Sequence, residues 1–455
     1  MALGKRGPSQ QDFWLSAVDL PKAPGHPFYV KLNKLLMEAD FDDWVEGLCE
    51  EYYAKGKGRP SIPPGVHFRM LFVGYLEGLR SQRGIAWRCS DSLSLRSFSG
   101  VPLQEPSPEH SSLRRVRKRL PLDVHEEVLK FVLRIAVEGK LLKGKTVAVD
   151  ATTLEANAAM KSIVRKDTGE DYKAYLRRLA EAEGLEDRSD EDLRRFDKKR
   201  KGKKASNKQW QSSTDQDSRV TKMKDGRTHL AYKAENTVYL DSDMVLSADI
   251  YHADHADNDS GTVSVVHAQK NRIETGSEAS IEELVAEKGY HKAETLSNAN
   301  KLGLRTYIPE PQLQHRRRWT DKPAEYKDAV YANRRRGRAA RSKKLQRLRS
   351  EHVERSFAHR CETGGGRRTW LRGLEKVSKR DLIQAAARNL GVIRRKLFGV
   401  GTARALQGSP GFDFGPMQPL WAIWRRFSRP LSSRLMKFLS SAPASVAMSG
   451  RASAA

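Results

Sequence analysis

The apolar positions in the first third of the chain recur at helical spacing. Residues 27–53, 66–79 and 123–138 each carry apolar side chains three or four positions apart, which predicts amphipathic helices. Shorter helical pieces are expected between them, around residues 85–98. The pattern therefore predicts a small all-helical domain over residues 26–140.

In the middle of the chain the pattern changes to short runs of β-branched, aromatic and aliphatic residues, which are typical of strands. Five strands are expected, at residues 146–149, 231–240, 244–251, 280–286 and 305–308. Helices are expected after them or between them, at residues 259–269, 293–302, 342–360 and 375–398. This order predicts an α/β fold in which a mixed five-stranded sheet is flanked by helices and preceded by the helical domain.

Three segments lack the pattern of a packed core. Residues 1–25 are a polar leader, and residues 400–455 are rich in Ser, Ala, Gly and Pro, which predicts a poorly ordered tail. Residues 161–215 carry an acidic run and then a basic run, which predicts a helical hairpin or a disordered insertion. We expect the main α/β domain to occupy residues 141–399, with this insertion inside it.

The net charge of the chain is more informative about its partners than its overall composition. The 455 residues carry a net charge of +27, and the isoelectric point is near 10.0. This favours a polyanionic partner, most often nucleic acid, although ribosomal and membrane-surface proteins are also basic. No apolar run approaches the ~18 residues needed to span a bilayer, no signal peptide is recognisable, and the three cysteines lie far apart. We expect no membrane association and a cytoplasmic, nucleoid-associated protein.

A basic helix is predicted after the Ser107-Pro-Glu109 start signal. Its positive side chains are Arg114, Arg115, Arg117, Lys118 and Arg119. Short helices ending in a basic one suit a DNA-binding domain of helix-turn-helix type. A solvated basic face is the alternative. A second basic stretch, residues 313–350, contains 14 Lys and Arg against three Asp and Glu.

Three acidic residues stand out by position. Asp150 follows the first predicted strand, Glu287 follows the fourth, and Glu354 lies on the helix after the fifth, among arginines and lysines. A carboxylate at the end of a buried strand is costly unless it is paired, hydrogen-bonded or bound to metal. If the first and fourth strands are neighbours, a helix across their edge could bring Glu354 to the other two acids. A turn cap at Asp150 and a surface ion pair at Glu354 are the structural alternatives.

Three carboxylates at one site repel one another unless cations neutralise them. Oxygen ligands without cysteine favour Mg²⁺ or Mn²⁺. Two such ions, roughly 3.5–4 Å apart, can activate a water or hydroxyl and stabilise the leaving oxygen in phosphodiester displacement. The sequence therefore predicts a two-metal site at Asp150, Glu287 and Glu354 that acts on a nucleic-acid backbone.

A second group of acids and histidines occurs in residues 252–259, His-Ala-Asp-His-Ala-Asp-Asn-Asp. Its density suggests a metal loop, but its place between a strand and a helix favours a polar loop with a helix cap. If the second metal-binding acid lies here instead of at Glu287, Asp254 or Asp257 is the candidate.

Four motifs together resemble the bacterial insertion-sequence transposases of the DDE class, which have an RNase H-like catalytic core. The motifs are Gly58-Arg-Pro-Ser-Ile-Pro-Pro64, Val149-Asp-Ala-Thr-Thr-Leu-Glu-Ala-Asn157, Val285-Ala-Glu-Lys-Gly-Tyr290, and Val353-Glu-Arg-Ser-Phe357 with its extension Thr363-Gly-Gly-Gly-Arg-Arg-Thr-Trp-Leu-Arg-Gly373. The last motif and its extension are the most specific, and together the pieces span about residues 28–398.

The resemblance implies an activity and site residues. Such enzymes bind the terminal inverted repeats of their element, cut the DNA with two divalent metal ions and join it to target DNA, usually as multimers on paired ends. Asp150 matches the first metal-binding acid and Glu354 the last, with Glu351 as a nearby rival. Further phosphate contacts are expected from Arg367, Arg368, Arg372, Lys379 and Arg380.

This chain departs from the family pattern at the second acid, where Glu287 stands in place of Asp. The extra methylene moves the carboxylate by roughly 1.5 Å, and a misplacement of about 1 Å can cost on the order of 100-fold in rate. Two alternatives therefore stay open. One is a catalytically impaired copy that only binds the element ends, and the other is an RNase H-like nuclease without strand transfer.

Overall fold

The structure is a computed structural model, and it describes residues 25–54, 61–184, 189–200, 206–223, 225–278, 280–313, 315, 317–399 and 401–403. The predicted leader and tail lie outside these residues, apart from residues 25 and 401–403. In the part of the chain that is described, no helix is both long enough and apolar enough to cross a membrane.

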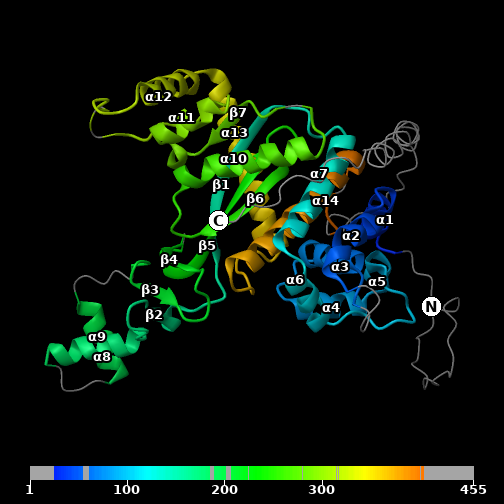
Figure 1. The fold of residues 1–455 in the computed structure, drawn as a ribbon, viewed down its shortest axis with the longest axis horizontal. Helices are drawn as coiled ribbons and strands as arrows, with labels where there is room; N and C mark the ends of the chain where they lie inside the picture. The colour runs from blue at the N-terminus through cyan, green and yellow to red at the C-terminus, as the bar shows by residue number, and fades with distance from the viewer. Residues whose placement is uncertain are drawn as a thin grey trace, which may run out of the picture. The chain divides into compact units, whose positions relative to one another are not determined.

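The N-terminal part is helical, as its apolar spacing predicts (Figure 1). Its elements are α1 (Pro27–Glu38), α2 (Phe41–Cys49), η1 (Glu50–Tyr52), α3 (Pro64–Leu76), α4 (Gln82–Asp91), α5 (Leu93–Ser99), α6 (His110–Arg119) and α7 (Leu122–Glu138). The single helix expected over residues 27–53 is wrong, because Asp40 adopts a left-handed conformation (φ 52°) that ends α1 and begins α2.

A six-stranded mixed sheet forms the centre of the α/β part, so the predicted mixed α/β fold is confirmed at that level. Its strands are β1 (Thr146–Glu155), β4 (Arg219–Lys222), β5 (Thr228–Tyr239), β6 (Met244–His252), β7 (Glu283–Ala286) and β8 (Arg305–Tyr307). β5 pairs antiparallel with β1, and β7 lies between β1 and β8 in parallel pairing. Both β4 and β6 pair with the other edge of β5.

The prediction of five strands missed β4, which has four residues and two of them are charged. It also placed the end of the first strand too early. β1 continues past Asp150 to Glu155, because β5 pairs along its whole later half. The partner on the other side, β7, stops at Ala286 opposite Val149. Asp150 therefore lies inside a strand, at the point where one of its two neighbours ends.

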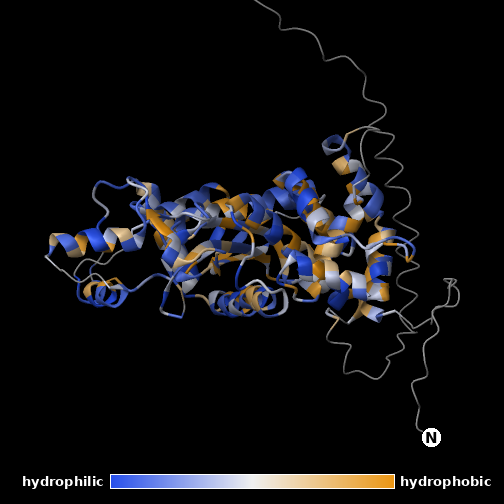
Figure 2. Ribbon diagram, turned by 90° about the horizontal axis from the view of Figure 1, so that it is seen from below, coloured by the Kyte–Doolittle hydropathy of each residue, from blue (hydrophilic) through white to orange (hydrophobic). Residues whose placement is uncertain are grey.

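Helices pack on the sheet, and α13 contacts β1, β5, β7 and β8. They are α10 (Asp257–Glu274), η3 (Lys288–Tyr290), α11 (Ala293–Lys301), α12 (Ala324–Gly337), α13 (Ala340–Ala358), the π-helical turn η4 (His359–Thr363) and α14 (Leu374–Phe398). The expected helices near α10, α11, α13 and α14 are present. The sequence pattern does not predict α12, because its arginines lie within the basic stretch of residues 313–350. In Figure 2 many helices show hydrophobic and hydrophilic stretches on one ribbon, as amphipathic helices do.

The charged insertion contains two helices and a small sheet in its described residues. It consists of η2 (Met160–Ser162), a two-stranded antiparallel sheet of β2 (Ile163–Arg165) and β3 (Trp210–Ser212), and the helices α8 (Tyr172–Ala182) and α9 (Asp190–Lys199). The two helices pack through a small cluster of their own, Leu176, Ala180 and Leu193. Of the two alternatives expected for this segment, the structure has the helical pair.

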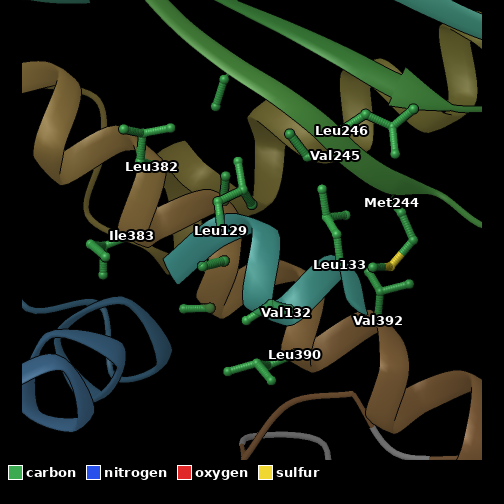
Figure 3. Packing of buried hydrophobic residues seen from close by; sticks show 14 of the residues in the cluster. Leu129, Val132, Leu133, Met244, Val245, Leu246, Leu382, Ile383, Leu390 and Val392 are labelled. Carbon is green, nitrogen blue, oxygen red and sulfur yellow. The ribbon is translucent and has the colours of Figure 1, made fainter. Parts of the chain in front are cut away.

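One hydrophobic cluster joins the N-terminal helices to the sheet. Figure 3 shows its middle, where leucines and valines of α7 meet those of α14 beneath β6. Leu133 of α7, Met244 of β6 and Leu390 of α14 are fully buried there. Burying each side chain of this size stabilises the fold by about 1.5–3 kcal/mol. The predicted domain boundary near residue 140 therefore crosses a continuous core.

The turn between β5 and β6 carries a buried acid that holds two helices. Asp243 accepts hydrogen bonds from Arg388 and Arg395 of α14, at 2.6 and 2.9 Å. Arg355 of α13 lies 3.7 Å away. Burial would raise the pKa of Asp243, but the neighbouring His352 and Arg388 outweigh it and lower the pKa to about 2. This anchor fixes α13 relative to the sheet, and α13 carries Glu354.

Asp243→Ala is expected to lower the free energy of unfolding by about 3–5 kcal/mol at neutral pH, because it leaves the buried Arg388 unpaired. The lowered pKa means that the carboxylate stabilises the fold above its unfolded pKa near 4. This contribution is lost as the pH falls toward about 2, so the difference between wild type and variant should shrink over that range. Urea unfolding at several pH values measures it. Asp241→Ala, an exposed acid of the same turn, is the control, and an equal loss there would contradict the account.

Candidate functional site

Two of the three predicted acids meet at the C-terminal end of β7, beside β1. Both strands are labelled in Figure 1. The parallel register pairs Val149 with Ala286, so Asp150 and Glu287 are the next residues along these two neighbouring segments. The apolar residues before them are buried in the core, which fixes both backbones. The expected neighbourhood of the first and fourth predicted strands is therefore confirmed.

A single guanidinium bridges the two carboxylates. Nη1 of Arg349, on α13, lies 3.0 Å from Oδ2 of Asp150 and 3.0 Å from Oε1 of Glu287. Nε of the same side chain donates to Oε1 of Gln346 at 3.2 Å. The Arg349 side chain is 10% exposed and that of Asp150 16%, whereas that of Glu287 is 50% exposed. The acids thus converge on one cationic nitrogen at the border between core and solvent.

The two carboxylates and the one guanidinium together carry a net negative charge when both acids are ionised. Burial, and after it the nearby Glu287, raise the pKa of Asp150 to about 6. The backbone N–H of Ala151, which donates to Oδ1 of Asp150 at 2.8 Å, and Arg349 act in the opposite direction. Two acids share one arginine, so the pair keeps an excess of negative charge and has oxygen lone pairs free for another cation.

A buried polar network supports the turn after Glu287. Glu235 of β5 is fully buried and accepts hydrogen bonds from Ser260 and Ser264 of α10, both at 2.6 Å, and from the Tyr290 hydroxyl at 2.9 Å. Burial and the neighbouring Glu235 raise the pKa of Tyr290 well above its usual value, so its hydroxyl stays a donor. Gly261 makes room for the ring, since a Cβ there would lie 2.5 Å from it. The network fixes η3 and with it the backbone of Glu287.

The His- and Asp-rich segment joins β6 to α10 as a polar loop, as the favoured interpretation predicts. The expected helix cap is wrong, because the N-cap residue is Ala256 and no side chain that the structure describes caps the helix. Asp254 lies 3.7 Å from Arg219 of β4. Asp257 opens α10, and its Oδ1 lies 2.7 Å from Nζ of Lys233. Asp257 is close enough to raise the pKa of Asp150, so of the two alternative acids it is the one beside the pair.

Glu354 lies on the same helix as Arg349 but does not join the pair. Its side chain is exposed, and its Oε1 accepts a hydrogen bond from the Ser350 hydroxyl one turn earlier, at 2.7 Å. The rival Glu351 forms an ion pair with Arg355 at 2.6 Å. Across the described ranges, no three acidic, histidine or cysteine side chains lie close enough together to hold a metal ion. The predicted three-acid group is therefore not assembled in this conformation.

The pair itself fits a divalent cation. Its donors are carboxylate oxygens, the ligands that Mg²⁺ and Mn²⁺ prefer. Both acids direct an oxygen at the same positive group, Nη1 of Arg349, so their oxygens already converge on one cationic position. Asp150 and Glu287 would hold one ion there, and Glu354 is the remaining acid on the helix that crosses them.

The glycine-rich extension docks on the far end of β1. Backbone groups of Glu155 pair with Arg367 and Thr369, at 3.2 and 2.9 Å. The Asn157 side chain donates to the carbonyl of Trp370 at 2.9 Å. Two of the motifs that carry the resemblance, one around Asp150 and one after Glu354, are therefore in direct contact although more than 200 positions apart.

The predicted phosphate-binding residues fall into three groups by exposure and contacts. Most are exposed and open to a ligand: Arg114, Arg115, Lys118, Arg119, Arg367, Arg368 and Arg372. Arg117 is partly buried, and burial together with Arg114 lowers its pKa to about 10. The other two predictions do not agree with the structure. Lys379 is buried against Glu375, and Arg380 stacks on Trp370 at 3.8 Å and donates to the carbonyl of Gly365.

Sequence patterns missed Arg349, Lys233 and Glu235. Arg349 is one of many positive residues in its stretch, and nothing in the spacing distinguishes it. Lys233 and Glu235 are the charged residues of the predicted strand over residues 231–240, and they stand at alternate positions, which places them on one face of β5. That pair of charges inside a predicted buried strand was the available signal.

Comparison with protein families gives one match. Residues 19–119 match the model of a transposase domain (DUF772), which supports a transposase and with it a DNA-cutting enzyme. The match covers α1 to α6 and the residues before them, and it includes neither Asp150, Glu287 nor Glu354. No curated protein matches the chain, and no solved structure does.

Proposed function

We propose that this protein is a DNA transposase of the DDE class that cuts the ends of an insertion sequence and joins them to target DNA. Asp150, Glu287 and Glu354 are its metal-binding acids. The observation that carries the proposal is the meeting of Asp150 and Glu287 on adjacent parallel strands, with α13 packed across them. The transposase-domain match and the mixed sheet flanked by helices, which suits an RNase H-like core, give it further support.

The chain's own residues have distinct roles in the proposed reaction. Asp150 and Glu287 would hold a divalent ion, and Glu354 would add its carboxylate from α13. When bound, two such ions activate the attacking oxygen and stabilise the leaving one. Glu235 and Tyr290 keep the Glu287 backbone in place through the buried network, and Asp243 holds α13 against the sheet.

The reaction consists of two transfers at phosphorus. In the first, a water oxygen bonds to a phosphorus at the element end, and the 3′ oxygen leaves with a proton as a 3′-hydroxyl. In the second, that hydroxyl oxygen bonds to a target phosphorus, and the target's own 3′ oxygen leaves with the proton. Both substrates are DNA backbones, which agrees with a net charge of +27.

DNA contacts are proposed on two exposed basic groups. The first is the α6 group of Arg114, Arg115, Lys118 and Arg119, within the segment that matches the transposase domain. The second is Arg367, Arg368 and Arg372 of the glycine-rich extension, which contacts the end of β1. We propose that the protein binds terminal inverted repeats through the first group and acts as a homo-oligomer on paired ends.

Glu354→Ala is expected to abolish metal-dependent cleavage of DNA that carries the gene's flanking sequences, whereas Glu351→Ala is expected to retain it. Both acids are on α13, and Glu351 already has Arg355 as its partner, so the two variants are closely matched. Cleavage in Mg²⁺ or Mn²⁺ is measured on denaturing gels. Full activity of Glu354→Ala would remove this residue from the site, and cleaved 3′-hydroxyl ends that never join a target would identify a nuclease instead.

The second candidate function is binding of element ends without catalysis. The longer side chain of Glu287, where the family has Asp, favours it, and so does the exposed Glu354. Tight, salt-dependent end binding by α1 to α6 without cleavage, even in Glu287→Asp, would be the result that supports it.

A further inference from the structure

Arg349 occupies the place between the two acids that a bound cation would take. Its Nη1 atom is equidistant, at 3.0 Å, from one oxygen of Asp150 and one of Glu287. The side chain is almost fully buried and is held on its other side by Gln346. A divalent ion cannot bind both of those oxygens while the guanidinium remains between them.

Another arginine of α13 shows how a purely structural ion pair differs. Arg341 binds Glu283 through two nitrogens, at 2.6 and 3.2 Å. That one acid, at the start of β7, receives further hydrogen bonds from Thr146 and Tyr307. There one buried carboxylate has several donors, whereas at Arg349 two carboxylates share one nitrogen. The Glu283 carboxylate therefore has its hydrogen bonds satisfied and its charge neutralised, whereas part of the negative charge of Asp150 and Glu287 is not neutralised.

We propose that Arg349 is a resident competing cation, which neutralises Asp150 and Glu287 in the metal-free protein and sets their affinity for divalent metal by having to leave when the ion binds. Displacement frees a guanidinium on the helix that also carries Glu354, five positions further on. Arg349 is thus an affinity-determining residue for the site and not one of its ligands. The inference rests on the proposed function in one respect, that the pair takes a divalent cation.

The competition predicts an increase in affinity when Arg349 is removed. In Arg349→Gln the two carboxylates face each other without their cation, so Mn²⁺ no longer has to displace a positive charge. The dissociation constant for Mn²⁺ is expected to fall on the order of 10–100-fold, the size of effect that residues beside metal ligands commonly have. In chelator the variant should melt at a lower temperature than wild type, and Mn²⁺ should raise its melting temperature more than it raises that of wild type.

The test is calorimetric titration of the full-length protein with Mn²⁺ alone, without DNA. Arg349→Lys keeps the positive charge and is expected to bind Mn²⁺ about as wild type does. Arg341→Gln is the matched control, because it breaks an ion pair of the same helix away from the site and should leave the Mn²⁺ affinity unchanged. Arg349→Met, which fills the space without charge, replaces Arg349→Gln should that variant not fold.

The outcomes separate this inference from the proposed function. Equal or weaker Mn²⁺ binding in Arg349→Gln, together with loss of binding in Asp150→Asn, would overturn the competing-cation role while the metal site stands. Undiminished binding in the double variant Asp150→Asn and Glu287→Gln would place the ion elsewhere and overturn both. Tighter binding in Arg349→Gln that disappears in Asp150→Asn is the result expected.

Discussion

Asp150→Asn is expected to reduce cleavage of element-end DNA by at least on the order of 100–1000-fold, as loss of a transition-state-stabilising group commonly does. The amide keeps the shape of the side chain but removes the charge that the metal needs. It also removes one of the two oxygens that converge on Nη1 of Arg349. The initial rate of strand cleavage in Mg²⁺, at saturating protein, measures the effect.

The loss of cleavage in Asp150→Asn should not result from a folding defect. Burial and Glu287 raise the pKa of Asp150 to about 6, so ionising this carboxyl costs more free energy in the folded protein than in the unfolded chain. Arg349 retains Glu287 as a partner in the variant. The melting temperature should therefore stay the same or rise. Asp249→Asn on β6, an acid paired with His267, is the control and should cleave at nearly the wild-type rate. Full activity of Asp150→Asn would contradict the assignment.

Glu287→Asp is expected to raise the cleavage rate on the order of 100-fold, because a misplacement of about 1 Å costs roughly that much. The present side chain is one methylene longer than the Asp of the DDE transposases that the chain resembles, and half of it is exposed. The buried network of Glu235 and Tyr290 holds its backbone, so shortening the side chain withdraws the carboxylate without moving the turn. Rates of the two proteins on the same DNA give the ratio.

A matched control is Glu283→Asp, which shortens an acid of the same strand that Arg341 binds away from the pair. It should give no increase in rate and some loss of stability. If Glu287→Asp is no faster than wild type, the longer side chain is already productive. The departure from the family pattern would then have no catalytic cost.

The sequence was sufficient for the parts of the fold that depend on local pattern. Runs of β-branched residues located β1, β5, β6, β7 and β8. The parallel pairing of β1 with β7 brings Asp150 and Glu287 together, since it places Val149 beside Ala286. The pattern failed where tertiary pairing decides. β1 extends to Glu155 only because β5 and the glycine-rich extension pair with it, and nothing in the apolar spacing indicates either partner.

The meeting of the two acids was predictable from the sequence, but their positive partner was not. Acids at strand ends are few and costly, so position alone selected Asp150 and Glu287. Arginines of α13 are many, and only the rotation of that helix on the sheet decides that Arg349 faces the acids while Glu354 is exposed. The same reason explains Lys379 and Arg380, which read as phosphate ligands but are directed into the packing around Glu375 and Trp370.

The most direct test of the central claim uses DNA that contains the gene with its flanking sequence on both sides, together with a target plasmid. Wild type, Glu287→Asp and Asp150→Asn are each incubated with it in Mg²⁺, and the junctions are sequenced. The account predicts element ends with 3′-hydroxyls covalently joined to target DNA, faster in Glu287→Asp and absent in Asp150→Asn. The result that would contradict the account is DNA that wild type and Glu287→Asp bind at its ends but neither cut nor join.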